Sequence, residues 1–261
     1  MSAVRSIGVI RILAFFYVFS SMAYAGSLPV IAIKNRLPLS LSVFEGGASF
    51  DLSVPKDFIS EIEGVYDEVY LQDLTDDGVA EVIFNLKGEG VNYCSRALYY
   101  NGDKRSLREL VFGRGGLCDF KVSNGYIVSS YKDGAAWVED VYVAKGVEVS
   151  IKISDRCVGC SEISRQDYRS DGLIIKYLVS NNVDFEKRTA LVASVASLKA
   201  RIFSSPEATR PTKKYLVRGD RISLLGFEGV CGEDWVEFRF LGKSITEGWL
   251  KCSDLDSCRR F

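Results

Sequence analysis

The sequence predicts a mainly β protein, with antiparallel β-meander or sandwich-like sheets, one short helix and a small C-terminal barrel. Runs of Val, Ile, Leu, Tyr and Phe alternate with polar residues along the chain, which is typical of half-buried strands. Dipeptides in which Gly follows Gly, Asp or Asn separate the runs and favour tight hairpin turns. These turn signals stand at Gly46-Gly47, Asp77-Gly78, Asn101-Gly102, Asn124-Gly125, Asp133-Gly134 and Asp171-Gly172.

The first 25 residues have the organisation of a cleavable secretory signal peptide. Arg5 and Arg11 precede or open a short apolar stretch, residues 12–19, and the small residues Ala23 and Ala25 stand at the positions that a signal peptidase reads. The apolar stretch is shorter than the roughly 20 residues that a membrane-spanning helix needs. This favours a cleaved signal over an uncleaved membrane anchor, and we expect export to the periplasm.

The composition excludes several classes of function. The chain has no His, which excludes Ser-His-Asp and Cys-His catalysis and imidazole-ligated zinc. The 33 basic and 34 acidic residues nearly balance, so no electrostatic footprint for nucleic acid is present. Seven cysteines fit an oxidising compartment, where disulfides persist. We therefore expect a non-enzymatic exported protein that has no transmembrane anchor once the signal is removed.

An acidic loop spans residues 73–81, between two apolar strand-like runs. Oxygen-bearing side chains occupy alternate positions and a Gly occupies the sixth, a pattern that turns oxygens toward a hard cation such as calcium. The alternative is a tight Asx-type turn, in which the carboxylates accept hydrogen bonds from backbone amides or face water. The expected calcium ligands are Asp73, Thr75, Asp77, Val79 (through its carbonyl) and Glu81.

This loop resembles the strand–loop–strand calcium loop of the FG-GAP and VCBS class of extracellular repeats. Thr75 stands where Asn or Asp is usual in that class, and Glu81 stands where Asp is usual. Together with residues 129–137, the loop makes residues 65–155 resemble a family of bacterial periplasmic proteins that carry a single such loop in a β-rich domain. The resemblance implies no enzymatic activity. It implies an inhibitor or immunity protein that binds a secreted antibacterial enzyme.

The middle of the chain predicts a meander followed by a helix. Residues 126–131, 136–143 and 147–153 alternate as strands and are joined by short turns. Residues 184–198 are the one clear helix candidate. Their acidic start suits the helix dipole, and three of their apolar residues share one helical face: Leu191, Val195 and Leu198.

We expect a domain boundary after this helix, with a β-rich domain at 26–197 and a second domain at 198–261. Five short strands in about 60 residues favour a small barrel. Three motifs, YLVRGDRISLL, WVEF and GWLKCSDL, stand in order and at regular spacing. With these motifs, residues 198–256 resemble the bacterial SH3 domain, and the resemblance implies a module that binds peptidoglycan peptides or protein segments.

Three aromatic residues of this domain are candidates for a ligand groove or for the barrel core. We expect Trp249 to lie in the core and Trp235 to be partly exposed, while Tyr215 fits either place. Tyr215 and Trp235 are therefore the expected partner-binding residues of the barrel.

The cysteines predict a disulfide framework. Cys157 and Cys160 have C-x-x-C spacing, but no strand-to-helix turn surrounds them, so a structural disulfide is favoured over a redox pair. Zinc would need a second such motif or His. The other expected pairs are Cys94 with Cys118 across a hairpin and Cys231 with Cys252 across the barrel. Cys258 is left as an alternative partner of Cys231, a free thiol or a bond between chains.

Two functions fit these observations. The first is a periplasmic inhibitor or immunity protein that neutralises a secreted envelope-acting effector, such as a lipase or a peptidoglycan hydrolase. Arg114, in the loop at residues 114–117, and Trp137, near a hairpin turn, are its expected anchors, although both segments also fit ordinary turns. The second is a wall-binding protein whose SH3-like domain captures peptidoglycan peptides.

Overall fold

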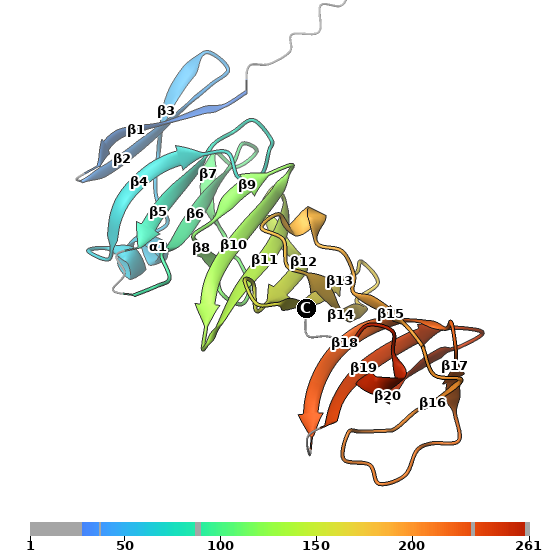
Figure 1. Ribbon diagram of the computed structural model, residues 1–261. Helices are drawn as coiled ribbons and strands as arrows, with labels where there is room; N and C mark the ends of the chain where they lie inside the picture. Colours follow the sequence, from blue (N-terminus) through green and yellow to red (C-terminus); the bar gives the residue numbers. More distant parts are fainter. Residues whose placement is uncertain (1–27, 37, 87–89, 231–232, 259–261) are drawn as a thin grey trace, which may run out of the picture.

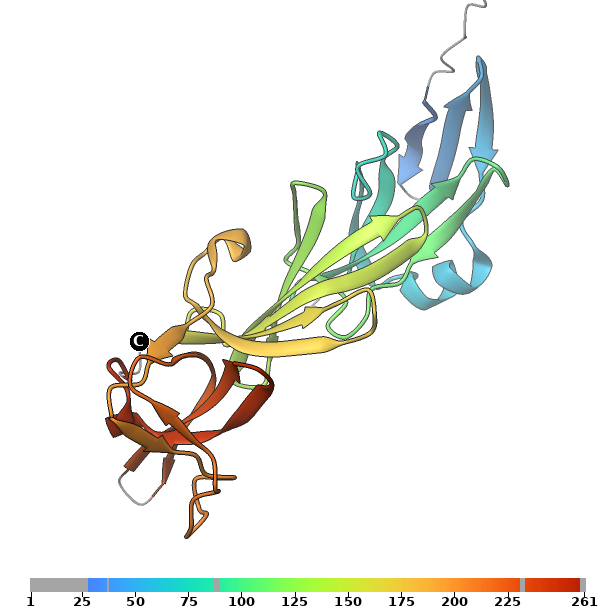
Figure 2. The ribbon, with the colours of Figure 1, turned by 90° about the vertical axis from the view of Figure 1, so that its right-hand side faces the viewer.

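The computed structural model describes residues 28–36, 38–86, 90–230 and 233–258. Over these ranges the protein is mainly β with antiparallel sheets, as predicted. The sheets follow one another along an elongated molecule, with the N-terminal sheet at one end and the C-terminal barrel at the other (Figures 1 and 2). The predicted signal peptide lies outside the described residues. No helix within the described ranges is long and apolar enough to cross a membrane.

The N-terminal part is built from a three-stranded and a five-stranded sheet that share one apolar core with a short helix. Phe58 of the helix packs edge-on against Phe84 of the second sheet, with ring centroids 5.1 Å apart. The bounds are β1 Val30–Arg36, β2 Leu39–Glu45, β3 Ala48–Leu52, α1 Lys56–Ile62, β4 Tyr66–Gln72, β5 Glu81–Leu86, β6 Cys94–Asn101, β7 Ser106–Leu110 and β8 Leu117–Cys118, which pairs with β6.

The helix α1 was not predicted, although its sequence carries the usual signals. Pro55 precedes the first turn with the fixed backbone angle that a helix start accepts, and Asp57 in that turn suits the helix dipole. Phe58 and Ile62 are four residues apart and both are buried. The helix is only seven residues long, so this periodicity extends over too few residues to stand out.

The central part is a six-stranded meander in which each strand pairs with its sequence neighbour. The predicted strands at 126–131, 136–143 and 147–153 are confirmed. Asn124 and Gly125 both have positive φ, 53° and 74°, as a two-residue hairpin turn of this type requires. The bounds are β9 Lys121–Ser123, β10 Tyr126–Asp133, β11 Ala136–Lys145, β12 Glu148–Arg156, β13 Glu162–Tyr168 and β14 Ile174–Ser180.

The C-terminal part is a four-stranded sheet and a two-stranded sheet that enclose a common core. A bridge between Phe203 and Trp249 joins the two sheets and closes the barrel on one side. Leu224, Phe238 and Leu250 fill the centre and are fully buried. The bounds are β15 Val192–Ser194, β16 Lys199–Arg201, β17 Tyr215–Val217, β18 Arg221–Val230, β19 Glu233–Leu241, β20 Ile245–Lys251 and the 3-10 turn η2 Cys252–Asp254.

The predicted helix at residues 184–198 is wrong. Asp184 does cap a helical turn, since its carboxylate accepts the N–H of Glu186, but this turn is the single 3-10 turn η1 Phe185–Lys187. The chain then runs extended, because neighbouring strands offer hydrogen-bonding edges and β-branched residues suit a sheet. Val195 is buried whereas Leu198 is 76% exposed, so the predicted common face does not exist.

Residues 189–194, which we call the junction strand, connect the central sheet to the barrel by hydrogen bonds on both sides. The N–H of Leu191 donates to the carbonyl of Leu178 on β14 at 2.9 Å. The carbonyl of Leu191 accepts the N–H of Leu224 on β18 at 3.0 Å, and β15 continues this pairing. A backbone ladder therefore runs from one sheet into the other. Because β15 belongs to the barrel sheet, the C-terminal unit begins before residue 198.

A buried charge network anchors the segment that leads into the junction strand. Arg165 on β13 binds Asp155 on β12 through two hydrogen bonds of 2.7 and 2.6 Å. Arg188, immediately before the junction strand, contacts the same carboxylate at 2.6 Å and Glu139 on β11 at 2.6 Å. Both guanidinium groups also donate to backbone carbonyls, those of Phe185 and Asn182. The network thus joins three strands to the incoming chain.

Three disulfides brace the fold. The predicted pairs Cys94–Cys118 and Cys157–Cys160 are confirmed. The predicted pairing of Cys252 with Cys231 is wrong, because Cys252 is bonded to Cys258, and Cys231 lies outside the described residues. The C-terminal segment folds back after η2, where the N–H of Asp256 donates to the carbonyl of Ser194 at 3.0 Å, and this return brings Cys258 to Cys252.

We predict that Arg188→Met lowers the free energy of unfolding by about 3–5 kcal/mol, because it leaves buried carboxylates without their cation. Urea denaturation at pH 7 measures this change. Lys187→Met is the matched control, since the side chain of Lys187 is 72% exposed and its replacement should change stability by less than about 0.5 kcal/mol. Equal effects of the two substitutions would contradict an anchoring role for Arg188.

Candidate binding sites

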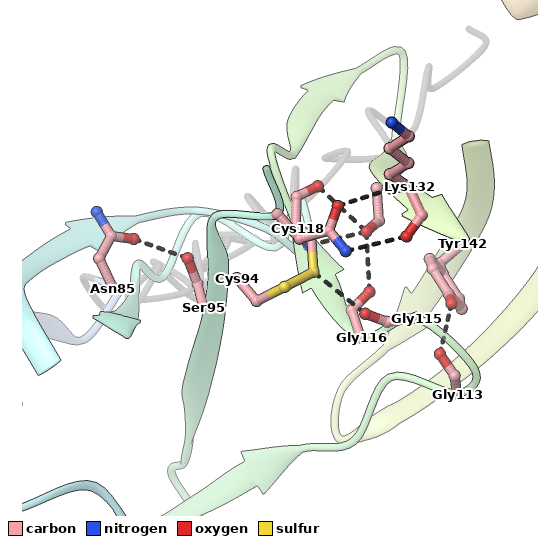
Figure 3. Close-up of a disulfide and its surroundings, with 11 residues drawn as sticks. Asn85, Cys94, Ser95, Gly113, Gly115, Gly116, Cys118, Lys132 and Tyr142 are labelled. Carbon is pink, nitrogen blue, oxygen red and sulfur yellow. Dashed lines mark hydrogen bonds between the residues drawn. A yellow bond between two sulfur atoms is a disulfide. The ribbon is translucent and has the colours of Figure 1, made fainter. Parts of the chain in front are cut away.

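Residues 113–118, which we call the Arg114 loop, follow β7 and end with β8, and their C-terminal end is fixed to two sheets. Cys118 is bonded to Cys94 across the β6–β8 pair, as Figure 3 shows. The hydroxyl of the buried Ser129 on β10 accepts the N–H of Cys118 at 2.8 Å and donates to the carbonyl of Gly116 at 2.9 Å. These bonds hold the loop because breaking either would leave a buried polar group without a partner.

The N-terminal end of the Arg114 loop is fixed by an aromatic residue of the central sheet. The hydroxyl of Tyr142 donates to the carbonyl of Gly113 at 2.8 Å (Figure 3). Gly115 lies against the ring of Tyr131 so closely that a Cβ there would approach ring atoms to 2.2 Å. Gly116 has a φ of +80°, in the left-handed region that favours Gly. The two glycines therefore allow a conformation that a larger side chain would disrupt.

Arg114 is the charged group that this loop presents to solvent. Its side chain is exposed, and its Nη1 donates to the hydroxyl of Tyr168 at 2.7 Å. A guanidinium presents several N–H donors in a planar fork that matches carboxylates and phosphates. Arg114 forms no ion pair among the described residues, so the group can bind an acidic side chain of another molecule.

A buried carboxylate lies close to Arg114. Asp140 is completely buried, and one of its oxygens accepts a hydrogen bond from the hydroxyl of Tyr131 at 2.9 Å and lies 3.3 Å from the hydroxyl oxygen of Tyr142, whose proton points mainly to Gly113. Burial, followed by the charge of Asp140, raises the pKa of both tyrosines, so their hydroxyls stay protonated and act as donors. The contacts with Asp140 hold the rings of Tyr131 and Tyr142 in place, and both residues contact the Arg114 loop.

Trp137, the other predicted anchor of the N-terminal domain, does not share a surface with the Arg114 loop. It is 42% exposed at the start of β11. In the β10–β11 ladder, Tyr131 pairs with Val138 whereas Lys132 pairs with Trp137. Because successive side chains point to opposite faces of a sheet, Trp137 lies on the face opposite to Tyr131, which contacts the loop. The two predicted anchors are therefore not parts of one binding face.

The acidic loop joins β4 to β5, as predicted, and its carboxylates bind backbone amides. Asp73 accepts the N–H groups of Asp76 at 2.8 Å and Gly78 at 2.9 Å, and Asp77 accepts that of Val79 at 2.9 Å. Within the described ranges no three His, Cys, Asp or Glu side chains form a group that would hold a metal ion. The observed contacts are those of an Asx-type turn.

Glu81 is the buried member of this loop, with 1% exposure. Its carboxylate accepts the N–H of Leu74 at 2.6 Å and the hydroxyl of Thr75 at 3.1 Å. Burial, with the nearby charges of Asp77 and Asp73, raises the pKa of Glu81 from 4.5 to about 7, although its two hydrogen bonds oppose the shift. Glu81 is thus a structural carboxylate whose protonation changes near neutral pH.

The barrel aromatics differ in part from the prediction. Trp235 is only 4% exposed and packs edge-on against Phe203, with ring centroids 4.9 Å apart, so it is a core residue and not a surface anchor. Trp249, expected in the core, is half-buried. Tyr215 is 51% exposed at the edge of a cavity of about 240 Å³, and Lys199 lies over its ring at 4.3 Å. Of the predicted pair, Tyr215 alone is available to a ligand.

Comparison with known proteins identifies no family. No protein-family model matches the chain, and no curated protein matches it. A solved structure described as "Structure of a Xanthomonas Type IV Secretion System related protein" is 13% identical, with a TM-score of 0.31 over 62% of this chain and 80% of that chain.

Sequence reasoning did not find the residues that support the Arg114 loop. Ser129 and Tyr142 come from strands that were predicted, whereas Tyr168 comes from β13, which was not; each is an ordinary strand residue in its own segment. The one local signal is the pair Gly115-Gly116, which indicates backbone crowding or a left-handed turn. The partners of that turn become visible only when β10, β11 and β13 lie beside it.

We predict that the stability of the protein changes with pH through Glu81. The folded state binds the proton of Glu81 more tightly than the unfolded state does, so its stabilising contribution is complete below pH 4.5 and is lost as the pH rises to about 7. Glu81→Gln, which does not titrate, should remove about 2–3 kcal/mol of this pH dependence. Urea denaturation of both proteins between pH 4.5 and 8 measures it.

The same measurement includes a test for calcium. With a chelator present, the difference between the two proteins should keep its pH dependence, and added calcium should leave the unfolding midpoint of the native chain unchanged. A midpoint that falls with chelator and is restored by calcium would instead show that Asp73, Asp77 and Glu81 hold an ion. Identical pH profiles for the two proteins would contradict a raised pKa for Glu81.

Proposed function

We propose that this protein is an exported, non-enzymatic binding protein that inhibits a secreted envelope-acting enzyme, of the lipase or peptidoglycan hydrolase class, in the periplasm. Three disulfides indicate export, because such bonds persist in oxidising compartments. The observation that carries the proposal is the Arg114 loop, in which one exposed guanidinium stands on a backbone fixed by a disulfide and buried hydrogen bonds.

A fixed loop suits inhibition for an energetic reason. Ordering a flexible loop on binding costs free energy, and a loop already held in one conformation avoids most of that cost. Arginine is also among the residues that most often dominate binding energy at protein interfaces. A hydrolase that uses an acidic residue in its cleft would offer Arg114 a carboxylate for two parallel hydrogen bonds. The proposed inhibitor therefore blocks the cleft by inserting the loop.

The experiment begins with a pull-down from envelope fractions and culture medium of the producing organism and of its competitors. We expect one protein to be recovered in stoichiometric amount and to have hydrolase activity that this chain inhibits. Arg114→Ala should weaken the inhibition by at least about tenfold, because it removes the exposed guanidinium without changing the loop backbone.

Arg210→Ala is the matched control, since Arg210 is an exposed arginine of the barrel domain far from the loop in sequence. Its replacement should leave the inhibition unchanged. Both proteins should keep the unfolding midpoint of the native chain. If the recovered enzyme remains fully active when saturated with this protein, the inhibitor proposal is wrong even though the two bind.

A second candidate function is wall binding by the C-terminal barrel, which resembles the SH3 domain of bacteria. The specific observation in its favour is the exposed Tyr215 beside a cavity that Ile202, Leu216 and Phe240 also line. An exposed aromatic ring next to an apolar hollow is a common site for peptide recognition. Sedimentation with purified sacculi tests this function, and Tyr215→Ala should reduce the bound fraction.

A further inference from the structure

A groove of about 610 Å³ lies where the central sheet and the barrel diverge. The junction strand pairs with the C-terminal half of β14 at residues 189–191, then leaves it and pairs with β18. The N-terminal half of β14, residues 174–177, therefore has the barrel sheet beside it but no strand paired to its outer edge. Figure 1 shows β14, β15 and β18 meeting at this point.

The outer edge of β14 presents unpaired backbone groups to this groove. Leu178 accepts, and Ser180 donates, hydrogen bonds on the side of the junction strand. The β13–β14 register is regular, and backbone groups of an antiparallel strand alternate in direction, so the N–H and C=O groups of Ile174 and Lys176 point to that same side. Among the described residues nothing accepts from or donates to them. This is an open edge that accepts an added strand.

The groove is apolar, and exposed hydrophobic side chains surround it. Leu173 and Ile174 stand on the side of β14, and they are 54% and 45% exposed. Leu241 and Ile245 face each other across the β19–β20 pair on the barrel side, and they are 69% and 66% exposed. Gathered exposed hydrophobic groups of this kind mark an interaction surface.

The charge of the groove indicates what kind of molecule it binds. Arg169 lines the groove, and among the described residues it forms no ion pair. Arg239, the other lining cation, is already bound to Glu247 at 2.6 Å. If a second copy of this chain paired with β14 edge to edge, the same cations of the two copies would come together and repel each other. An incoming segment with acidic side chains would instead be attracted.

We propose that the groove binds an extended segment of a partner polypeptide, which adds a strand to β14 at Ile174 and Lys176. The segment carries apolar residues at alternate positions, which cover Leu241 and Ile245, and an acidic residue that meets Arg169. It continues the ladder that the junction strand begins at residues 189–191. The inference is independent of the Arg114 loop and of inhibition, because the two sites share no residue.

A phage-displayed library of random heptapeptides, panned on the full chain with its disulfides intact, tests the proposal. Lys176→Pro is the diagnostic variant: it removes the outward N–H and leaves the pairing of β14 with β13, and Pro is tolerated on an edge strand in this orientation. Lys176→Ala, which removes the charge and keeps the N–H, is the matched control. We expect enriched peptides with alternating apolar residues and an acidic residue.

Synthetic copies of those peptides should bind the native chain, bind Lys176→Pro at least about tenfold more weakly, and lose less than this with Lys176→Ala. If Lys176→Pro lowers the unfolding midpoint, the double variant Leu241→Ser and Ile245→Ser replaces it, because both side chains are largely exposed, and it should weaken binding to a similar degree.

Three results would overturn the proposal. The first is panning that enriches no peptide able to distinguish the native chain from the edge variants. The second is enriched peptides whose affinity is the same for all variants. The third is a concentration-dependent dimer, seen by analytical ultracentrifugation, that Lys176→Pro abolishes, because this would make a second copy of the chain the occupant of the edge.

Discussion

The buried charge network around Asp155 is the interaction on which the arrangement of this molecule depends. Removing charges from water is expensive, and the expense is offset only when each group finds close, well-oriented partners. Asp155 and Arg165 meet this condition with hydrogen bonds of 2.7 and 2.6 Å, and Arg188 adds a third hydrogen bond to Asp155 at 2.6 Å. Because Arg188 directly precedes the junction strand, the network also sets where that strand meets β14, and hence where the barrel stands.

The two proposed binding sites differ in whether their backbone groups already have hydrogen-bond partners. In the Arg114 loop, Ser129 and Tyr142 satisfy loop backbone groups from behind, so the loop presents a fixed shape and one exposed charge. On β14, the outward N–H and C=O groups of Ile174 and Lys176 have no hydrogen-bond partner among the described residues. The Arg114 loop would recognise a partner by its shape and charge. The edge of β14 would bind a partner by adding a strand to the sheet, and these backbone hydrogen bonds do not depend on the partner's side chains.

The candidate site could be predicted only in part, and the reason lies in the range of the interactions. The position of Arg114 in a Gly-containing loop is visible in the sequence, and so is the pairing of Cys94 with Cys118. The supports Ser129 and Tyr142 are 11 or more residues from their loop partners. The same limit applies to Trp235, since the sequence shows an aromatic residue on a strand but not the Phe203 ring that buries it.

The sequence by itself determined the β class, the hairpin turns, three strands of the central meander and the barrel strands, because alternation and turn propensity act over a few residues. Only the tertiary structure decided the secondary structure of residues 184–198. Asp184 and the apolar spacing after it are compatible with a helix, but the open edges of β14 and β18 and the carboxylate of Asp155 bind this segment in extended form. Contacts with distant strands outweighed local propensity because they bury side chains and satisfy backbone groups that an exposed helix would leave in water.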